Sequence, residues 1–310
     1  MNKNNRVEEV RNYRKIEEII PSHWSEGVVK ANGIDHRYYR TGGDKQPLVL
    51  LHGFMEGALS WLKTAKILEK DYDIIMIDAR GHGKSGGVET GFAQTQFTGD
   101  AVGVIKVLEL RKPHLMGFSQ GGGTGVFIAH EYPELLESLI VVGWGDDWNE
   151  TEEFNTDFVE SESYQNWLES YVSWLEKLKT QDHEGRMISA LSQLPPGRSG
   201  MSEEEYVVWV ENCANLDLSM VKNSASAWAE VRGKIRRMVK ALKNISIPTL
   251  VMASSFFPTP GEKYIQEEES ENPNLRIIRF VNTGHMIIRE QFDNFINLAI
   301  DFLRKNSTRI

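Results

Sequence analysis

Short apolar runs alternate with amphipathic patterns along the first half of the chain. Between the apolar runs, apolar residues recur at helical spacing, as in 57–70, 97–110 and 121–133. The runs themselves are of the kind that fill strands buried on both faces of a sheet, and they lie within 46–54, 72–81, 113–119 and 136–143. Ahead of them, residues 26–30 and 34–40 flank an Ala-Asn-Gly turn, which predicts a β-hairpin.

This pattern stops near residue 145 and returns after residue 243. Residues 146–243 contain helical patterns and no clear buried strand. They also hold five of the eight tryptophans, most of which we expect to pack these helices together. Strands and helices are then expected to alternate again, with strands in 247–255 and 275–281 and helices near 261–270 and in 290–305.

Taken together, these patterns predict an α/β fold with a mostly parallel, eight-stranded sheet that carries helices on both faces. A helical cap is inserted after the sixth strand. In this division residues 1–25 form an N-terminal extension, 26–145 and 244–310 form the α/β core, and 146–243 form the cap. Open α/β sheets bind ligands at the carboxyl ends of their strands, and we expect the cap to lie over that edge.

Charge and composition narrow the functional classes. The 310 residues include 35 Lys and Arg and 44 Asp and Glu, for a net charge of −9, whereas binding to nucleic-acid phosphates needs a basic face. We therefore expect no nucleic-acid partner. No apolar stretch is long enough for a membrane helix, and the charged first 24 residues do not resemble a signal peptide, so we expect a cytoplasmic protein. The only cysteine, Cys213, excludes an internal disulfide. The sequence predicts no metal and no cofactor, and it leaves the oligomeric state open.

A single serine lies between glycines in the segment Gly117-Phe118-Ser119-Gln120-Gly121. This G-x-S-x-G pattern follows a predicted strand and opens a predicted helix, which is the setting of a nucleophile elbow. In such a sharp turn the serine has a strained backbone, and a side chain at either glycine would collide with the neighbouring strand or helix. The exposed hydroxyl then lies at a helix N-terminus, which favours developing negative charge.

Three further segments accompany this motif, namely "LLHGF" at 50–54, "DARGHGKS" at 78–85 and "NTGHMIIREQF" at 282–292. In this order and spacing they resemble the α/β-hydrolase superfamily, in its subset of esterase-like and lactonase-like serine hydrolases with a helical cap. The resemblance covers about residues 26–305. It is specific for the fold and much less so for the substrate, because one fold hosts many functions.

The resemblance implies a base for the serine. His285, in the turn after the last strand, is the expected group that removes the proton of Ser119. His52 and His82 belong to two of the other motifs, and we expect them to shape loops rather than to act as bases. Epoxide hydrolases and haloalkane dehalogenases share the fold but need a carboxylate at the elbow, so Ser119 argues against both activities.

The same resemblance implies an oxyanion hole and a pocket. The main-chain N–H groups of Gln120 and Phe54 are the expected donors to the oxyanion. Because both are backbone groups, their side chains are only weakly constrained. Phe54, together with Trp144 and Trp148, is expected to line an apolar pocket for a small-molecule substrate.

The acid of the expected triad has no clear position. After the seventh strand, residues 254–257 read Ser-Ser-Phe-Phe where relatives commonly carry an aspartate. Some relatives place the acid after the sixth strand, where Asp146 and Asp147 are available and Asp146 is closer to the strand end. Either could orient the imidazole, both could be solvated residues at the start of the cap, or a serine–histidine dyad could act without an acid.

The leading hypothesis is a serine hydrolase that cleaves a small, fairly apolar carboxylic ester or lactone through an acyl-enzyme intermediate. Carbon–carbon, amide and thioester hydrolysis use the same residues and stay open. The alternative is a non-catalytic or weakly catalytic ligand-binding homologue. The missing acid after the seventh strand favours this alternative, and the intact serine and histidine disfavour it.

Overall fold

One mixed sheet organises the chain. The computed structural model describes residues 3–87, 92–144, 161–193, 200–223, 231–254 and 260–307. Within these residues nine strands pair in the order β1-β2-β4-β3-β5-β6-β7-β9-β8. Their bounds are β1 Ser25–Ala31, β2 Ile34–Arg40, β3 Pro47–Leu51, β4 Asp73–Ile77, β5 His114–Phe118, β6 Ser138–Trp144, β7 Thr249–Ala253, β8 Tyr264–Glu268 and β9 Leu275–Val281. The central strands from β4 to β9 are parallel, which confirms the predicted α/β architecture.

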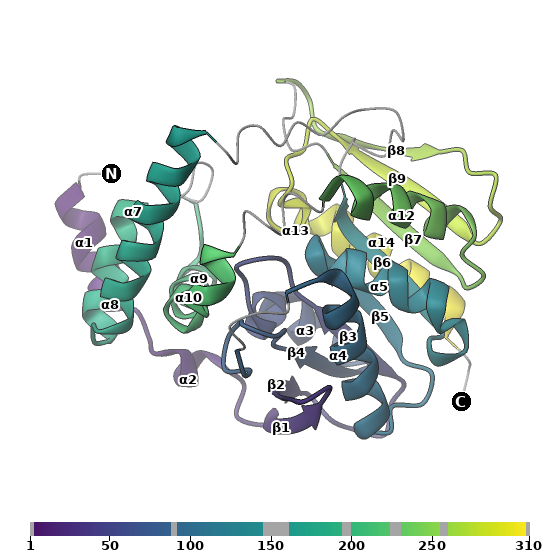
Figure 1. Ribbon diagram of the computed structural model, residues 1–310, viewed down its shortest axis with the longest axis horizontal. Coiled ribbons are helices and arrows are strands. Elements are labelled where there is room, and N and C mark those ends of the chain that lie inside the picture. The colour runs from purple at the N-terminus through teal and green to yellow at the C-terminus, as the bar shows by residue number, and fades with distance from the viewer. Residues whose placement is uncertain are drawn as a thin grey trace.

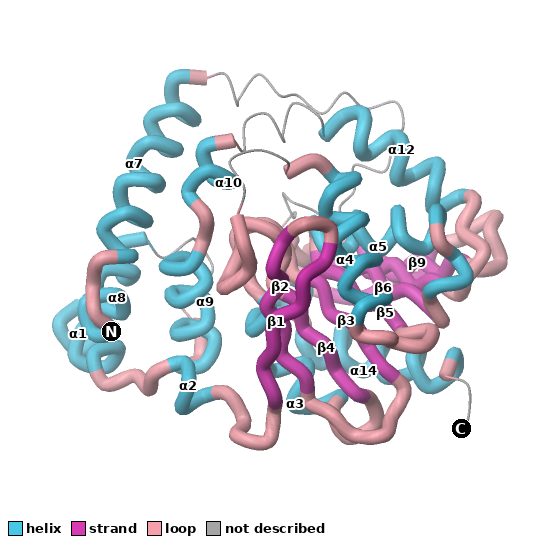
Figure 2. The backbone as a smooth tube through the Cα atoms, turned by 60° about the horizontal axis from the view of Figure 1, so that its bottom comes forward, coloured by secondary structure: helices cyan, strands magenta, loops and turns pink. Residues whose placement is uncertain are grey.

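Helices cover both faces of this sheet (Figures 1 and 2). Two buried clusters show which helices share a face, because one contains side chains of α4, α5 and α12 and the other contains side chains of α3 and α14. The helices of these two layers are α3 (Leu62–Leu68), α4 (Gln94–Val107), α5 (Gln120–Glu131), α12 (Val231–Lys243) and α14 (Phe292–Asn306). Short helices in the connections are α13 (Ile287–Glu290) and the 3₁₀ turns η1 (Ala58–Trp61), η2 (Pro133–Leu135) and η3 (Leu191–Gln193).

Successive residues of the central strands point to opposite helical layers, as the period of a strand requires. In β3, Leu48 and Leu50 belong to the cluster with α3 and α14, whereas Val49 and Leu51 belong to the cluster with α4 and α5. All four side chains are buried. This two-sided burial explains why the strands appear in the sequence as continuous apolar runs.

Both ends of the sheet are antiparallel. The predicted hairpin is confirmed, since β1 pairs with β2 from Ser25–Arg40 to Ala31–Ile34. The helix expected near 261–270 is wrong, because Tyr264–Glu268 forms β8, an edge strand antiparallel to β9. β8 has mostly exposed side chains and no buried face, so it carries no apolar alternation that would reveal a strand. This strand is why the sheet has nine members rather than eight.

A second group of helices lies beside the carboxyl ends of β3 and β4 (Figure 1). It comprises α1 (Lys3–Arg11), α2 (Ile16–Ile19), α7 (Glu162–Lys179), α8 (His183–Ala190), α9 (Glu203–Asn215) and α10 (Leu218–Lys222). In α9, the Asn212 amide donates to Ser60 Oγ at 3.0 Å. Just before α10, the N–H of Asp217 donates to the carbonyl of Gly81 at 2.9 Å. These bonds join the helices to the loops that follow β3 and β4.

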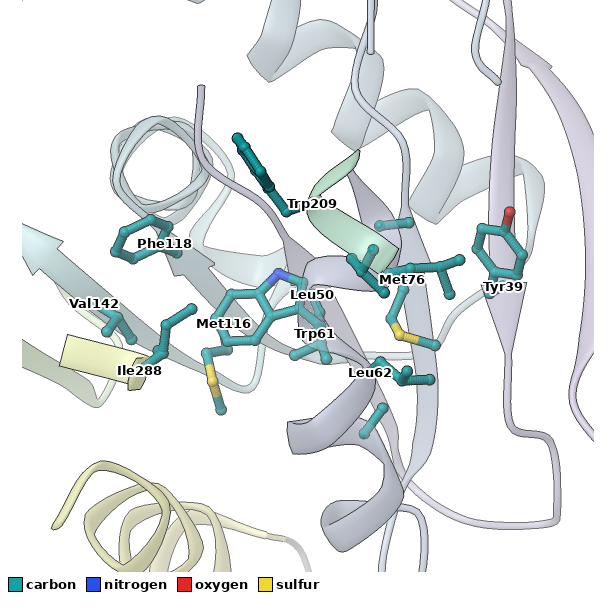
Figure 3. Close-up of a cluster of buried hydrophobic side chains, with 14 of the residues drawn as sticks. Tyr39, Leu50, Trp61, Leu62, Met76, Met116, Phe118, Val142, Trp209 and Ile288 are labelled. Carbon is teal, nitrogen blue, oxygen red and sulfur yellow. The ribbon is translucent and has the colours of Figure 1, made fainter. Parts of the chain in front are cut away.

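Aromatic side chains connect this helical group to the sheet. Trp209 of α9 stacks near Trp174 of α7, with ring centroids 6.3 Å apart. Trp209 also belongs to the same buried cluster as Trp61 of η1 and Phe118 at the end of β5 (Figure 3). Trp174 and Trp209 are therefore core residues, as expected from the sequence, whereas Trp167 is 47% exposed. Among the described residues, no helix is both long and apolar enough to cross a membrane.

Candidate active site

Ser119 occupies a strained turn between β5 and α5. Its φ of 50° and ψ of −112° lie in a region that non-glycine residues rarely adopt, so the predicted strain is confirmed. The turn is held by two backbone bonds, from the N–H of Ser119 to the carbonyl of Val142 at 2.8 Å and from the N–H of Gly123 to the carbonyl of Ser119 at 3.0 Å. Ser119 remains partly exposed at the N-terminus of α5.

Both glycines of the motif are required by close backbone contacts. A Cβ on Gly117 would lie 2.5 Å from the backbone nitrogen of Gly122 in α5. A Cβ on Gly121 would lie 2.6 Å from the carbonyl carbon of Leu51 and 2.7 Å from the carbonyl oxygen of His52. These contacts confirm the predicted collisions with the neighbouring helix and strand. The elbow therefore brings the first turn of α5 directly against the end of β3.

Two main-chain N–H groups, those of Phe54 and Gln120, lie where α5 meets the end of β3. The neighbours of Phe54 are used, because the N–H of Gly53 donates to Glu56 Oε2 at 3.2 Å and that of Met55 donates to His82 Nε2 at 3.2 Å. Similarly, the N–H of Gly121 donates to the carbonyl of His52 at 3.1 Å. Within the part of the chain that the structure describes, the N–H groups of Phe54 and Gln120 have no acceptor. Both residues are partly exposed, so these donors are available to a ligand.

His285 lies in the turn between β9 and α13, beside the residue that precedes Ser119. The rings of Phe118 and His285 have centroids 5.0 Å apart. The carbonyl of His285 is close to β6, since a Cβ on Gly143 would lie 3.0 Å from its oxygen. The N–H of Ile287 donates to this carbonyl at 3.0 Å and begins α13. His285 is thereby held at the carboxyl ends of β5, β6 and β9.

Burial lowers the pKa of His285 to about 4, because removing the imidazolium from water disfavours its charged form. The ring is therefore neutral at physiological pH, which is the state that can accept a proton.

The family assignment follows from the match of this chain to a family model. The model described as the alpha/beta hydrolase fold matches residues 46–291, which include Ser119, His285 and most of the sheet. The chain belongs to the α/β-hydrolase fold family. This result confirms the resemblance identified from the four sequence motifs.

Curated relatives of this α/β-hydrolase match over part of their length. The 2-hydroxy-6-oxononadienedioate/2-hydroxy-6-oxononatrienedioate hydrolase of Paraburkholderia phymatum is 33% identical over 113 residues, which are 35% of this chain and 39% of the relative. Serine hydrolase BPHL of Mus musculus is 28% identical over 181 residues, which are 54% of this chain and 62% of the relative. The chain thus spans between about two fifths and three fifths of the length of these relatives.

Solved structures share the fold over nearly the whole chain. An esterase from Exiguobacterium antarcticum has a TM-score of 0.63 at 21% identity, with 90% of this chain and all of the esterase covered. The epoxide hydrolase CorEH has a TM-score of 0.64 at 20% identity, with 91% of this chain and 99% of that chain covered. At these identities the likeness shows the α/β-hydrolase fold and does not distinguish between the activities.

The remaining expected site residues are described only in part. Trp144 ends β6, but its side chain is outside the described structure. Asp146, Asp147 and Trp148 lie outside the described residues as well. Ser254, the first of the four residues after β7 where the resemblance implies an acid, is buried, and its hydroxyl has no hydrogen-bond partner among the described residues.

Sequence reasoning missed Phe118 as a residue that shapes the site. Its ring fits between two glycines, because a Cβ on Gly53 would lie 2.8 Å from it and a Cβ on Gly143 would lie 2.5 Å from it. Gly143 has a φ of 72° next to an irregularity in the pairing of β6 with β7. An aromatic residue directly before the serine and a glycine near the end of the next strand are the only signals in the sequence. From this position between Gly53 and Gly143, the ring of Phe118 packs beside the ring of His285.

The pKa of His285 predicts an acidic limit of activity well below that of an ordinary histidine. If His285 has its expected role as the base, kcat/KM for a neutral ester should hold from pH 7 down to about 5 and fall by half near pH 4, where the imidazole becomes protonated. The measurement is a pH–rate profile, with tryptophan fluorescence recorded at each pH to show that the protein is folded. A half-maximal value between pH 6 and 7 would contradict this prediction and would indicate that a neighbouring carboxylate offsets the effect of desolvation on the ring.

Proposed function

We propose that this α/β-hydrolase is a serine hydrolase that cleaves a small, fairly apolar carboxylic ester or lactone through an acyl-enzyme intermediate. One observation carries the proposal. Ser119 has a strained backbone and is partly exposed at the N-terminus of α5, and the N–H groups of Phe54 and Gln120, at the junction of α5 with the end of β3, have no acceptor among the described residues. Such donors stabilise an alkoxide that forms on a carbonyl carbon attacked from the serine.

The proposed reaction has two steps. In the first, Ser119 Oγ attacks the carbonyl carbon while the imidazole of His285 takes the hydroxyl proton, and the carbonyl electron pair moves onto the oxygen held by Phe54 and Gln120. The tetrahedral intermediate then collapses, and the leaving alcohol receives the proton from His285. In the second step water attacks the acyl-enzyme, gives its proton to His285, and releases the carboxylic acid as Ser119 is restored.

The acid and the pocket are parts of this proposal. We assign the orienting acid to Asp146 or Asp147, and the pocket to Phe54 with Trp144 and Trp148. The partly exposed ring of Phe54, 6.2 Å from that of His82, supports its place in the pocket wall. The bonds from α9 and from the segment before α10 to the loops after β3 and β4 support a cap that covers the carboxyl ends of the strands.

A second candidate is hydrolysis of a carbon–carbon bond beside a ketone by the same residues. It is favoured by the relatives named as hydrolases of 2-hydroxy-6-oxo acids, at 31% to 33% identity over parts of their length. In this reaction the same two N–H groups would hold the oxyanion that forms from the ketone. A substrate panel of esters, lactones, amides and 2-hydroxy-6-oxo dienoic acids separates the two candidates.

Labelling with a fluorophosphonate tests whether Ser119 is a nucleophile at all. The probe phosphonylates an activated serine with loss of fluoride, and we expect stoichiometric labelling of the wild type within minutes, located at Ser119 by peptide mass spectrometry. The matched control is Ser119→Ala, which should remain unlabelled. Folded wild-type protein that resists labelling would refute catalysis and favour a ligand-binding role.

A further inference from the structure

Two histidines connect the loops after β3 and β4. Each histidine accepts a hydrogen bond from a backbone N–H of the other histidine's loop. The N–H of Ala79, in the second loop, donates to His52 Nε2 at 3.0 Å. In return, the N–H of Met55, in the first loop, donates to His82 Nε2 at 3.2 Å. The two rings meet edge to face with centroids 4.9 Å apart, and both are buried.

The hydrogen bonds define one neutral tautomer for each ring. Nδ1 of His52 faces the carbonyl of Gly53 at 2.8 Å, and Nδ1 of His82 faces the carbonyl of Arg80 at 2.8 Å, so both Nδ1 atoms carry the proton. Each Nε2 is then a lone-pair acceptor, as the bonds from Ala79 and Met55 require. Burial lowers the pKa of His82 to about 3, so this ring keeps its accepting nitrogen throughout the neutral range.

These bonds determine where the N–H of Phe54 points. The carbonyl of Gly53 belongs to the same planar peptide unit, and it accepts from His52 Nδ1 and from the N–H of Glu56 at 3.3 Å. In a trans peptide the N–H points opposite to the carbonyl, away from these donors. The following unit is held by the bond from Met55 to His82, and Met55 has a left-handed φ of 59°. Hydrogen bonds therefore fix both peptide units that adjoin Phe54, the one before it and the one after it.

We propose that His82 is a positioning residue for the oxyanion hole, holding the peptide after Phe54 so that the Phe54 N–H is aimed at the developing oxyanion. This role rests on the proposed function of Ser119 and Phe54. His82 acts through the backbone of Met55 and does not itself touch the substrate.

The loop that carries His82 is anchored strongly enough for this role. Arg80 donates from Nε and Nη2 to Asp100 at 2.6 Å and 2.7 Å, and both residues are buried. The carbonyl to which His82 donates is therefore on a fixed loop. Asp78 ties the same loops together, because its carboxylate accepts from the N–H groups of Ala58 at 2.7 Å and Lys84 at 3.0 Å.

Two amide substitutions separate the functions of the two ring nitrogens. Glutamine at position 82 can place its oxygen where Nε2 lies and keep the bond from Met55. Asparagine ends where Nδ1 lies, and it keeps only the bond to Arg80. The variants His82→Gln and His82→Asn therefore differ in the one hydrogen bond that the proposal needs.

The test measures kcat, KM, thermal stability and inhibition by a trifluoromethyl ketone, which forms a tetrahedral oxyanion on the serine. For His82→Asn we expect kcat to fall by about 10- to 100-fold and KM to change by less than about twofold. The reason is that the Phe54 N–H no longer points at the oxyanion, whereas the contacts that bind the substrate are unchanged. Ketone affinity should fall by the same factor as kcat. His82→Gln should recover most of both losses.

Three results would overturn this role of His82 alone. They are wild-type kcat in His82→Asn, equal losses in His82→Gln and His82→Asn, or a fall in kcat with unchanged ketone affinity. If His82→Asn does not fold, His82→Gln is compared with the wild type alone. Any fall in kcat must then be matched by an equal fall in ketone affinity, and a fall in only one of them would contradict the proposal. Wild-type protein that neither hydrolyses the panel nor reacts at Ser119 would instead refute the proposed function itself.

Discussion

Replacing Ser119 by alanine is expected to lower ester hydrolysis by about 10⁴-fold or more, to a level set by the binding of substrate near the remaining donors. The reason is that no acyl-enzyme can form without the hydroxyl, and the N–H groups of Phe54 and Gln120 would then act only on attack by water. Alanine has the same backbone restrictions as serine at a φ of 50°, so the elbow and the fold should be kept. Steady-state kcat and KM on the best ester of the panel measure the effect.

The matched control is Ser192→Ala, which removes another serine hydroxyl, in this case from an exposed residue of η3. Its Oγ donates only to the carbonyl of Ser189 at 2.8 Å, and we expect wild-type kinetics. A Ser119→Ala protein that is folded and retains a tenth of the wild-type rate would exclude a serine nucleophile at this position.

The second large effect is structural. Gly121→Ala should destabilise the protein by about 3 kcal/mol or more, because the new methyl group would press on the backbone of Leu51 and His52 and not on a movable side chain. Either β3 or the first turn of α5 must then shift, which also displaces Ser119 and Gln120. We expect a large fall in the urea midpoint of unfolding together with loss of hydrolysis.

Gly200→Ala provides the control for this substitution. Among the described residues, a Cβ on Gly200 would have no neighbour within 4 Å, so we expect the added methyl group to meet no packed backbone. Its midpoint should stay within experimental error of the wild type. If Gly121→Ala unfolds at the same urea concentration as Gly200→Ala, the close approach of α5 to β3 is refuted.

The parts of this protein that could be predicted from sequence are those with a strong local signal. Leu48 to Leu51 are apolar because both sheet faces are covered, and the strands could be found from that alone. Gly117 and Gly121 could be assigned because a sharp strand-to-helix turn has few solutions. The strain at Ser119 follows from the same geometry.

Other features depend on contacts between distant segments. β8 has no buried face, and its pairing with β9 leaves no periodic pattern in Tyr264–Glu268. The bond from Met55 to His82 joins residues 27 positions apart. The ring of Phe118 packs against Gly53, in the loop after β3, and against Gly143 of β6. The sequence shows each of these residues but not which of them meet.

The shared cluster around Trp209 has a consequence for how the molecule opens and unfolds. Side chains of α7 to α10 and of the layer that contains α3 and α14 belong to one buried apolar cluster, which includes Trp209 (Figure 3). Separating the two groups of helices would expose this interior to water, at a cost that grows with the apolar area exposed. The protein should therefore melt in a single cooperative transition, in which α9 leaves the sheet only as the sheet itself unfolds.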